Sequence, residues 1–382
     1  MRRKYNTLVA AILLAIWPAF ADPCPPSLTA AARDVARLRS VGEPFAPPCR
    51  VIHPPELRAE LDRKLRRDLP LSPELFVEAL WRLGYIDRAE GVYQKLLDFY
   101  ISQVLGFYEP ATNEMVVVRH QDTENSAARS VWVHELAHAA QEHRFRLPTR
   151  LLAMRDNGDA QRAASAIAEG DATLVMFLLG PGPEALDAAE AALRGQSQAL
   201  PRPEGLPEYF VADLVFPYAV GFSAVRRAYE VGGWAAVDRL LATPSPSTAA
   251  LLHPGRPQAA PVPDRDLPAV PIGWREVIAD TVGEWGLSFW LGRRMPRDRA
   301  EALAAGWNGD RFRVIRSVED PGRWALAMRI RARGPGEAET LVAALSEHAS
   351  SLLRNLSAVS PGIAATRNGV TIELRANWPE PR

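Results

Sequence analysis

The stretch that decides the fold is VWVHELAHAAQEH, residues 131–143, in which His134 and His138 stand four positions apart and Glu135 follows the first of them. Four residues of an α-helix advance by about 400°, so the two imidazoles lie on one face, one turn apart. Their ring nitrogens can therefore meet one zinc ion, which lies about 2.0–2.1 Å from a histidine nitrogen. Glu135 is rotated by about 100° and flanks the ion, where a carboxylate can act as a base toward water.

The alternative interpretation is an ordinary helix whose imidazoles face solvent. Against it, most neighbours of the motif are apolar, which is typical of a buried helix, and buried histidines need partners. These neighbours are Val131, Trp132, Val133, Leu136, Ala137, Ala139 and Ala140. The sequence therefore favours a metal-binding helix. His143 follows nine positions after His134, which turns it away from the ligand face, and we do not expect it to bind the metal.

A catalytic zinc site takes three protein ligands and keeps one position for water. No third histidine follows at short spacing, so the remaining ligand must come from another element. Glu169 lies in SAIAEGDATLV, residues 165–175, where a carboxylate is costly to bury unless it is paired. Gly170 costs about 1 kcal/mol relative to alanine inside a helix and typically marks the close approach of another backbone. We expect Glu169 to be the third ligand, on a helix that crosses the motif helix at the metal; the alternative is a surface glutamate.

Asp171 is the other carboxylate in this stretch. It is rotated by about 200° from Glu169, so one helix cannot direct both side chains at the same ion. We expect Asp171 to hold a metal ligand in place from outside the coordination sphere, or to make a structural hydrogen bond.

Residues 1–21 have the pattern of a secretory signal peptide. A basic start, RRK at 2–4, precedes an apolar run over 8–20 and a small-x-small site at 19–21. The run is short for a membrane span and Pro18 interrupts it, although an N-terminal anchor is the alternative. We expect cleavage after Ala21, export to the periplasm or the medium, and no stable membrane span afterwards.

The charges of the chain are balanced. Its 382 residues include 45 basic and 45 acidic side chains, and loss of the signal peptide removes three basic ones, which leaves a net charge of −3. Nucleic-acid-binding proteins concentrate basic residues on one face, whereas here both signs are interspersed. We therefore expect no nucleic-acid partner.

Only two cysteines occur, Cys24 and Cys49. In an oxidising compartment an isolated pair most simply forms one disulfide. The alternative, a pair of metal-binding thiolates, lacks the usual Cys-x-x-Cys spacing. We expect a disulfide that holds the start of the mature chain.

The order of the expected elements predicts an α+β fold, with a mostly helical catalytic domain around a small sheet and a smaller α+β unit at the C-terminus. The expected divisions are a helical N-terminal segment (22–100), a catalytic domain (101–253), a proline-rich linker or wrapped loop (254–272) and the C-terminal unit (273–382).

Turn and cap residues predict the individual elements. In the first three parts we expect a hairpin over 106–119 and several helices. The helices are expected at 27–38, after the N-cap Ser72, from Asn125 or Ser126 through the motif, at 158–179 and at 209–242. The last of these is expected to break at Pro217 and at Gly232–Gly233. In the C-terminal unit we expect helices near 275–293 and 335–356 and strands at 311–318, 324–333 and 369–374.

HELAHAAQEHRF (134–145), followed by AEGDAT (168–173), resembles the gluzincin branch of the zincin metallopeptidases. More narrowly, it is similar to a group of exported bacterial proteins with HExxH and EGDA motifs. QVLGFYEPATNEMVVV (103–118) and AAGWNGDRF (304–312) extend the resemblance over about residues 100–312. The chain departs from the group at Arg144, where a histidine often stands.

The resemblance implies a zinc-dependent peptidase that acts on a peptide or protein, with Zn²⁺ between a sheet and a helical half. An edge strand beside the motif helix would pair with an extended peptide, and the hairpin at 106–119 is the natural candidate. Zinc would lower the pKa of a water molecule to about 7, and Glu135 would take its proton. Tyr218 or His253 could stabilise the oxyanion, although either is equally typical of a packed residue at a turn.

A second hypothesis is a non-catalytic binding or scaffold protein of the cell envelope that keeps zinc for structure. In that case the C-terminal unit would be the functional part. Structural zinc sites usually close all four positions with cysteine or histidine. HExxH with an acidic third ligand therefore favours the peptidase.

Overall fold

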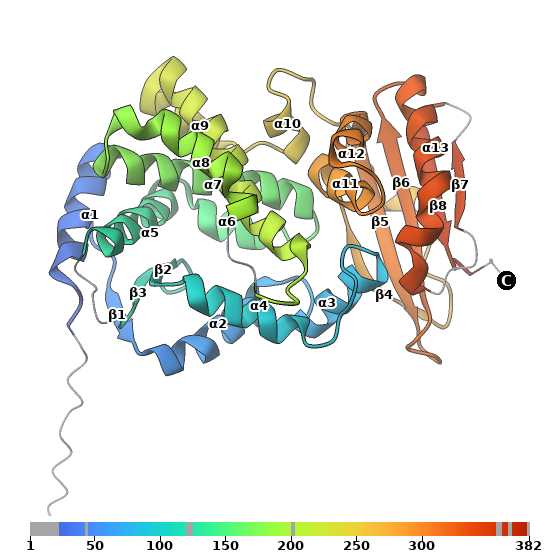
Figure 1. The fold of residues 1–382 in the computed structure, drawn as a ribbon, viewed down its shortest axis with the longest axis horizontal. Helices are drawn as coiled ribbons and strands as arrows, with labels where there is room; N and C mark the ends of the chain where they lie inside the picture. The colour runs from blue at the N-terminus through green and yellow to red at the C-terminus, as the bar shows by residue number, and fades with distance from the viewer. Residues whose placement is uncertain are drawn as a thin grey trace, which may run out of the picture.

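The computed structural model describes residues 23–42, 45–119, 125–199, 203–356, 361–365 and 369–379. The expected signal peptide, residues 1–21, lies outside them. The fold is α+β, as predicted: a helical part around a three-stranded sheet stands beside a five-stranded sheet with its own helices (Figure 1).

The N-terminal segment wraps the helical part. It contains α1 (Pro26–Leu38), β1 (Cys49–Ile52), α2 (Pro54–Asp68), α3 (Pro73–Arg82) and α4 (Val92–Gln103). The predicted N-cap of α3 is confirmed, since the Ser72 hydroxyl accepts a hydrogen bond from the N–H of Leu75. The disulfide between Cys24 and Cys49 is also confirmed, and it indicates an oxidising compartment.

The predicted hairpin forms the small sheet. Its strands are β2 (Gly106–Glu109) and β3 (Glu114–Val118), joined by a turn in which Asn113 has a φ of 53°, a conformation that asparagine tolerates. The sequence did not reveal β1, which pairs in parallel with β3 and gives the order β1-β3-β2. Because β3 lies in the middle, β2 is an edge strand.

Long helices form the interior: α5 (Ser126–Phe145), α6 (Leu147–Ala153), α7 (Gly158–Leu179), α8 (Leu186–Ala199), α9 (Glu208–Ala242) and α10 (Thr248–Leu252). Asn125 and Asn157 cap α5 and α7 through their side-chain oxygens, so the predicted starts of both helices are confirmed. The predicted break at Pro217 is wrong, because α9 continues through it, but the helical dihedrals fail at Gly232 and Gly233 as predicted.

Among the described residues, one helix, α9, is long and apolar enough to cross a membrane by length and composition alone. Within its most apolar window 44% is buried inside the protein, where α9 packs against α7. The core helix of a soluble protein passes the same test. The absence of a membrane span in the mature chain therefore stays a prediction.

The C-terminal unit is an antiparallel sheet of order β4-β5-β6-β8-β7 with three helices. Its elements are β4 (Trp274–Asp280), α11 (Gly283–Gly292), α12 (Arg297–Ala304), β5 (Trp307–Ser317), β6 (Trp324–Ala332), α13 (Pro335–Leu352), β7 (Gly362–Ala365) and β8 (Thr371–Ala376). The helix expected near 275–293 is wrong in its first half. Residues 274–280 pair with β5 and therefore form strand β4. The helix begins only at Gly283, whose φ is 77°.

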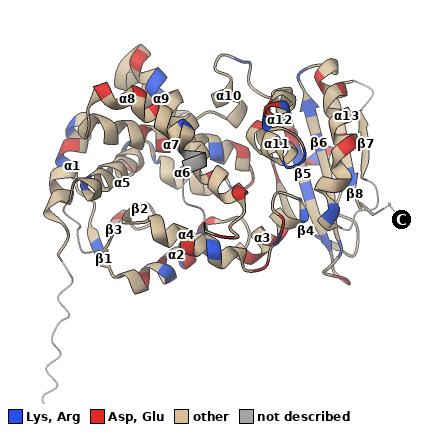
Figure 2. Ribbon diagram, viewed as in Figure 1, with Lys and Arg blue, Asp and Glu red and all other residues tan. Residues whose placement is uncertain are grey.

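The two faces of this sheet differ. Apolar residues such as Leu326, Met328 and Leu374 pack against α11, α12 and α13. The opposite face carries arginines, and Figure 2 shows basic residues along β5 and β6. The proline-rich segment 254–272 lies against that face, since its carbonyl oxygens at Pro261 and Pro268 accept hydrogen bonds from strand arginines. Interspersed prolines suit this segment because they hold an extended chain that needs few backbone N–H partners.

Three carboxylates, of which Asp159 and Asp310 are buried, lie where the start of α7 meets the C-terminal unit. Asp159, at the start of α7, accepts hydrogen bonds from the N–H and the hydroxyl of Thr248. Asp280 of β4 accepts one from the N–H of Gly158, and Asp310 of β5 accepts two from the backbone before α11. Burial raises the pKa of Asp159 to about 7 and that of Asp310 to about 6.

The raised pKa of Asp159 predicts how stability depends on pH. The folded protein holds this proton more tightly than the unfolded chain, in which the pKa is about 3.9, so this group makes the protein less stable as pH rises from about 4 to 7. Asparagine does not titrate. We therefore expect the free energy of unfolding of Asp159→Asn, relative to wild type, to rise by up to about 1.4 kcal/mol per pH unit across this range.

Urea unfolding at several pH values measures this difference, with Asp298→Asn on the exposed side of α12 as the control. A difference between Asp159→Asn and wild type that stays constant with pH would contradict the assigned ionisation.

Candidate metal centre

Three predicted ligands meet between α5 and α7. The Nε2 atoms of His134 and His138 are 3.2 Å apart, and an Oε2 oxygen of Glu169 lies 3.0 Å from the first and 3.5 Å from the second. Zinc bonds of about 2.0–2.1 Å in a tetrahedron place two ligand atoms about 3.3 Å apart. Among the described residues this is the one cluster of at least three such side chains whose ligand atoms lie within 4.8 Å of one another. The donor set and its spacing both fit zinc.

The pKa shifts of His138 and Glu169 also indicate that a positive charge is stabilised at this cluster. Burial opposes protonation of His138, but the charge of Glu169 outweighs it and raises the pKa of His138 to about 10. Burial likewise opposes ionisation of Glu169, yet the two imidazoles hold the pKa of its carboxyl well below the usual range. The carboxylate therefore needs a positive charge beside it, which a proton or a metal ion can supply.

Two glycines set the position of Glu169. A methyl group on Gly170 would lie 2.3 Å from the carbonyl oxygen of Gly221 on α9, and one on Gly221 would lie 1.8 Å from that of Ala166 on α7. The predicted close approach at Gly170 is therefore confirmed, but the partner named for it is wrong: the backbone that α7 meets there belongs to α9. Contact with the motif helix α5 comes from Ala172 and Val175 on another side of α7.

A hydrogen-bond chain orients His138. Its Nδ1 lies 3.0 Å from Oε1 of Gln141, while Nε2 of that amide donates to the carbonyl of Ala168 and to Asp171, each at 2.9 Å. Because the amide oxygen only accepts, this network assigns the imidazole proton to Nδ1 and leaves Nε2 free for a metal. The sequence did not single out Gln141, although its place three positions after His138 was a usable signal.

Asp171 is buried, and an arginine from the N-terminal segment faces it. Burial raises the pKa of Asp171, while the guanidinium of Arg39, 3.3 Å away, opposes that shift. Arg39 also binds Asp238 at 2.8 Å and lies 4.1 Å from the ring centre of Trp234. Nothing local in the sequence indicated Arg39, which is 132 positions before Asp171. The structure thus places Asp171 outside the ligand cluster, in contact with a residue that holds a ligand.

Glu135 faces the edge strand of the small sheet. Its Oε2 oxygen accepts a hydrogen bond of 2.9 Å from the backbone N–H of Tyr108 on β2. Glycine is required nearby, because a methyl group on Gly106 would lie 2.6 Å from the ring of Trp132 on α5. The carboxylate of Glu135 therefore lies at the outer edge of β2, on the side away from β3.

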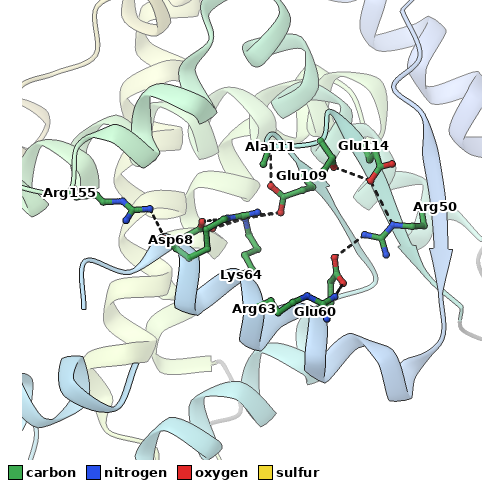
Figure 3. A network of polar contacts seen from close by, with 11 residues as sticks. Arg50, Glu60, Arg63, Lys64, Asp68, Glu109, Ala111, Glu114 and Arg155 are labelled. Atoms are coloured by element: carbon green, nitrogen blue, oxygen red, sulfur yellow. Dashed lines mark hydrogen bonds and ion pairs between the residues drawn. The ribbon is translucent and has the colours of Figure 1, made fainter. Parts of the chain in front are cut away.

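A polar network anchors the far end of β2 to α2. The buried carboxylate of Glu109 accepts hydrogen bonds from Arg67 and from the N–H of Ala111, with Lys64 3.6 Å away (Figure 3). Arg155, which follows α6, donates to the carbonyl oxygen of Arg67. These contacts hold the edge strand against α2, and α2 against the loop between α6 and α7.

The structure places the two expected oxyanion partners differently. The ring of Tyr218 on α9 lies 6.0 Å from that of His134, and burial together with the neighbouring Glu169 raises its pKa well above the usual value. His253 instead binds Glu284 of α11 at 2.5 Å, in a pocket whose lining includes none of the three ligands. Only Tyr218 is therefore brought to the metal cluster.

Comparison with known proteins agrees with this geometry. Residues 96–179 match a family model described as "Putative metallopeptidase family (DUF6782)", and residues 271–373 match one described as "Domain of unknown function (DUF8575)". No curated protein matches the chain. No solved structure matches it either. The first match contains the hairpin, α5 and α7, and so all three predicted ligands and Glu135, which supports a metallopeptidase.

The crossing of α7 and α9 generates a prediction. Gly170→Ala places a methyl group against backbone, so we expect it to lower the free energy of unfolding by about 1–3 kcal/mol and to weaken metal binding, because Glu169 shifts with α7. Gly195→Ala on α8 is the matched control. Outside its own helix, no atom of the described residues lies within 4 Å of the added methyl, and helix propensity should raise stability by up to about 1 kcal/mol.

Chemical unfolding and metal titration of the two variants measure these effects. If Gly170→Ala were as stable as Gly195→Ala, the close contact between the helices would not exist in solution.

Proposed function

We propose that the protein is an exported zinc-dependent peptidase in which His134, His138 and Glu169 hold the metal and Glu135 is the general base. The observation that carries this proposal is the convergence of the three ligand atoms within 3.5 Å of one another, with Glu135 on the same helix as the two histidines. A structural zinc site would normally use four cysteine or histidine ligands, whereas this cluster has three ligands and leaves a position for solvent.

A zinc ion held by His134, His138 and Glu169 would act as a Lewis acid, which lowers the pKa of water to about 7 and polarises a carbonyl group. Glu135 takes the proton from the attacking water and delivers it to the leaving amine. Its hydrogen bond to the N–H of Tyr108 holds the carboxylate in one orientation, so that little reorganisation is needed at the moment of reaction. The hydroxyl of Tyr218 stabilises the negative charge that develops on the carbonyl oxygen.

The edge strand β2 supports an extended peptide as the substrate. The outer side of β2 is the side on which the N–H of Tyr108 points to Glu135, so a peptide added there runs past the base and the metal ligands. Peptides that add to a sheet edge gain affinity from main-chain hydrogen bonds, largely independent of their sequence.

The location of the protein follows from two features. The disulfide between Cys24 and Cys49 is typical of exported proteins, and the pattern of residues 1–21 is that of a cleaved signal peptide. A protease outside the cytosol is consistent with both.

Metal content tests the ligand assignment. We expect about one zinc per chain in the wild-type protein and a large loss in Glu169→Ala, because two imidazoles alone do not hold a catalytic zinc. His143→Ala, an exposed histidine on the same helix, should retain the metal. Elemental analysis after dialysis measures all three proteins, and equal zinc in Glu169→Ala and wild type would exclude Glu169 as a ligand.

Glu135→Gln tests the base. The amide cannot accept a proton, so we expect hydrolysis of unfolded protein or peptide substrates to fall by roughly 10²–10⁴-fold while zinc stays bound. Proteolysis assays and metal analysis of the same sample separate the two effects. A variant with full activity would refute the assigned mechanism, and bound zinc without any cleavage by the wild type would favour the scaffold hypothesis.

A further inference from the structure

A cavity of about 280 Å³ lies where α3, α7, α9 and α11 meet strands β4, β5 and β6 of the C-terminal unit. Six aromatic rings contribute to its lining: Phe76, Tyr85, Tyr209, Trp285, Trp290 and Phe312. Aliphatic side chains from the loop after α2 and from the sheet complete most of the wall. The cavity is therefore predominantly apolar, and both the helical part and the C-terminal unit are needed to form it.

Two helices lead from this cavity to the metal centre. On α7 the lining residues Gly158, Arg162 and Ser165 follow one stripe of the helix, and Glu169 is the next residue of that stripe, one turn on. On α9 the lining ends at Pro217, directly before Tyr218. One helical turn rises about 5.4 Å, and an extended peptide spans about 3.3–3.6 Å per residue. The cavity lining at Ser165 is thus one helical turn, about 5.4 Å along α7, from Glu169, a length that one or two residues of an extended peptide can span.

The charged groups at the cavity are already paired. Arg162 donates to Asp213 at 2.8 Å and lies 4.4 Å from the ring centre of Trp285, while Asp280 accepts hydrogen bonds from backbone N–H groups. A charged side chain that entered would lose its hydration without gaining a partner. In contrast, a cavity of about 150 Å³ is enough to hold a benzene ring, so this one has room for a large apolar side chain.

We propose that the cavity is the specificity pocket of the peptidase and receives a large apolar side chain, preferably aromatic, from the peptide residue that flanks the cleaved bond. This inference rests on the proposed function and adds the class of substrate. It also assigns a role to the C-terminal unit, whose residues Ile278, Leu326 and Met328 form one wall of the pocket.

The experiment compares matched peptides that differ at one position, with phenylalanine, leucine, alanine or aspartate beside the cleaved bond. We expect kcat/KM for phenylalanine to exceed that for alanine by roughly 10–100-fold, from the burial of its ring. Ser165→Phe places an aromatic ring among the lining residues of the cavity and should abolish this preference for phenylalanine over alanine. Ser288→Phe on α11, which lines a different pocket, is the control and should keep the preference.

A binding measurement keeps the pocket testable without hydrolysis. Calorimetry of zinc-loaded Glu135→Gln with N-acetyl-phenylalaninamide and N-acetyl-alaninamide should give binding of the first only, and adding Ser165→Phe should remove it. If the aromatic amide binds to Glu135→Gln but the wild-type protein cleaves no peptide, the pocket would be supported and the proposed function refuted. Cleavage by the wild type without any preference for large apolar residues would refute the assignment of the cavity as the specificity pocket. So would a preference for phenylalanine, or binding of the aromatic amide, that persists in Ser165→Phe.

Discussion

The whole arrangement depends on one electrostatic constraint: two imidazole nitrogens and a carboxylate oxygen lie within 3.0–3.5 Å of one another in a partly buried space. Three electron-pair donors so close together are stable only around a positive charge. The packing of α7 between α5 and α9 keeps these three atoms close together. The apolar faces of α5 and α7 meet, and glycines at the α7–α9 crossing let that pair of helices approach within backbone contact. A metal ion therefore fits the site as the fold presents it.

The N-terminal segment is part of this site. Arg39, which follows α1, is 3% exposed and faces Asp171, and Asp171 accepts a hydrogen bond from the amide that orients His138. The disulfide Cys24–Cys49 brackets α1 and joins it to β1, which pairs with the central strand of the small sheet. Removal of this segment would leave Asp171 as a buried charge without its arginine, which is strongly destabilising. The segment is thus part of the candidate metal centre.

Local signals made much of the fold predictable from the sequence. The cap Asn125 indicated the start of α5, and the motif spacing indicated three of the four central site residues. Glu169 was predictable because a carboxylate in an apolar helix needs a partner. What the sequence could not give depends on distant contacts: the pairing of β1 with β3, the approach of Arg39, and the switch of residues 274–280 from helix to strand by pairing with β5. Such contacts leave no periodic or neighbouring signal in the chain.

The most direct test of the account is anomalous diffraction at the zinc absorption edge from crystals of the mature, zinc-loaded protein. The account predicts one dominant peak between α5 and α7, about 2.0–2.2 Å from Nε2 of His134, Nε2 of His138 and an oxygen of Glu169, with solvent at the remaining position. A peak elsewhere, or a zinc ion whose four positions are all filled by protein side chains, would contradict it.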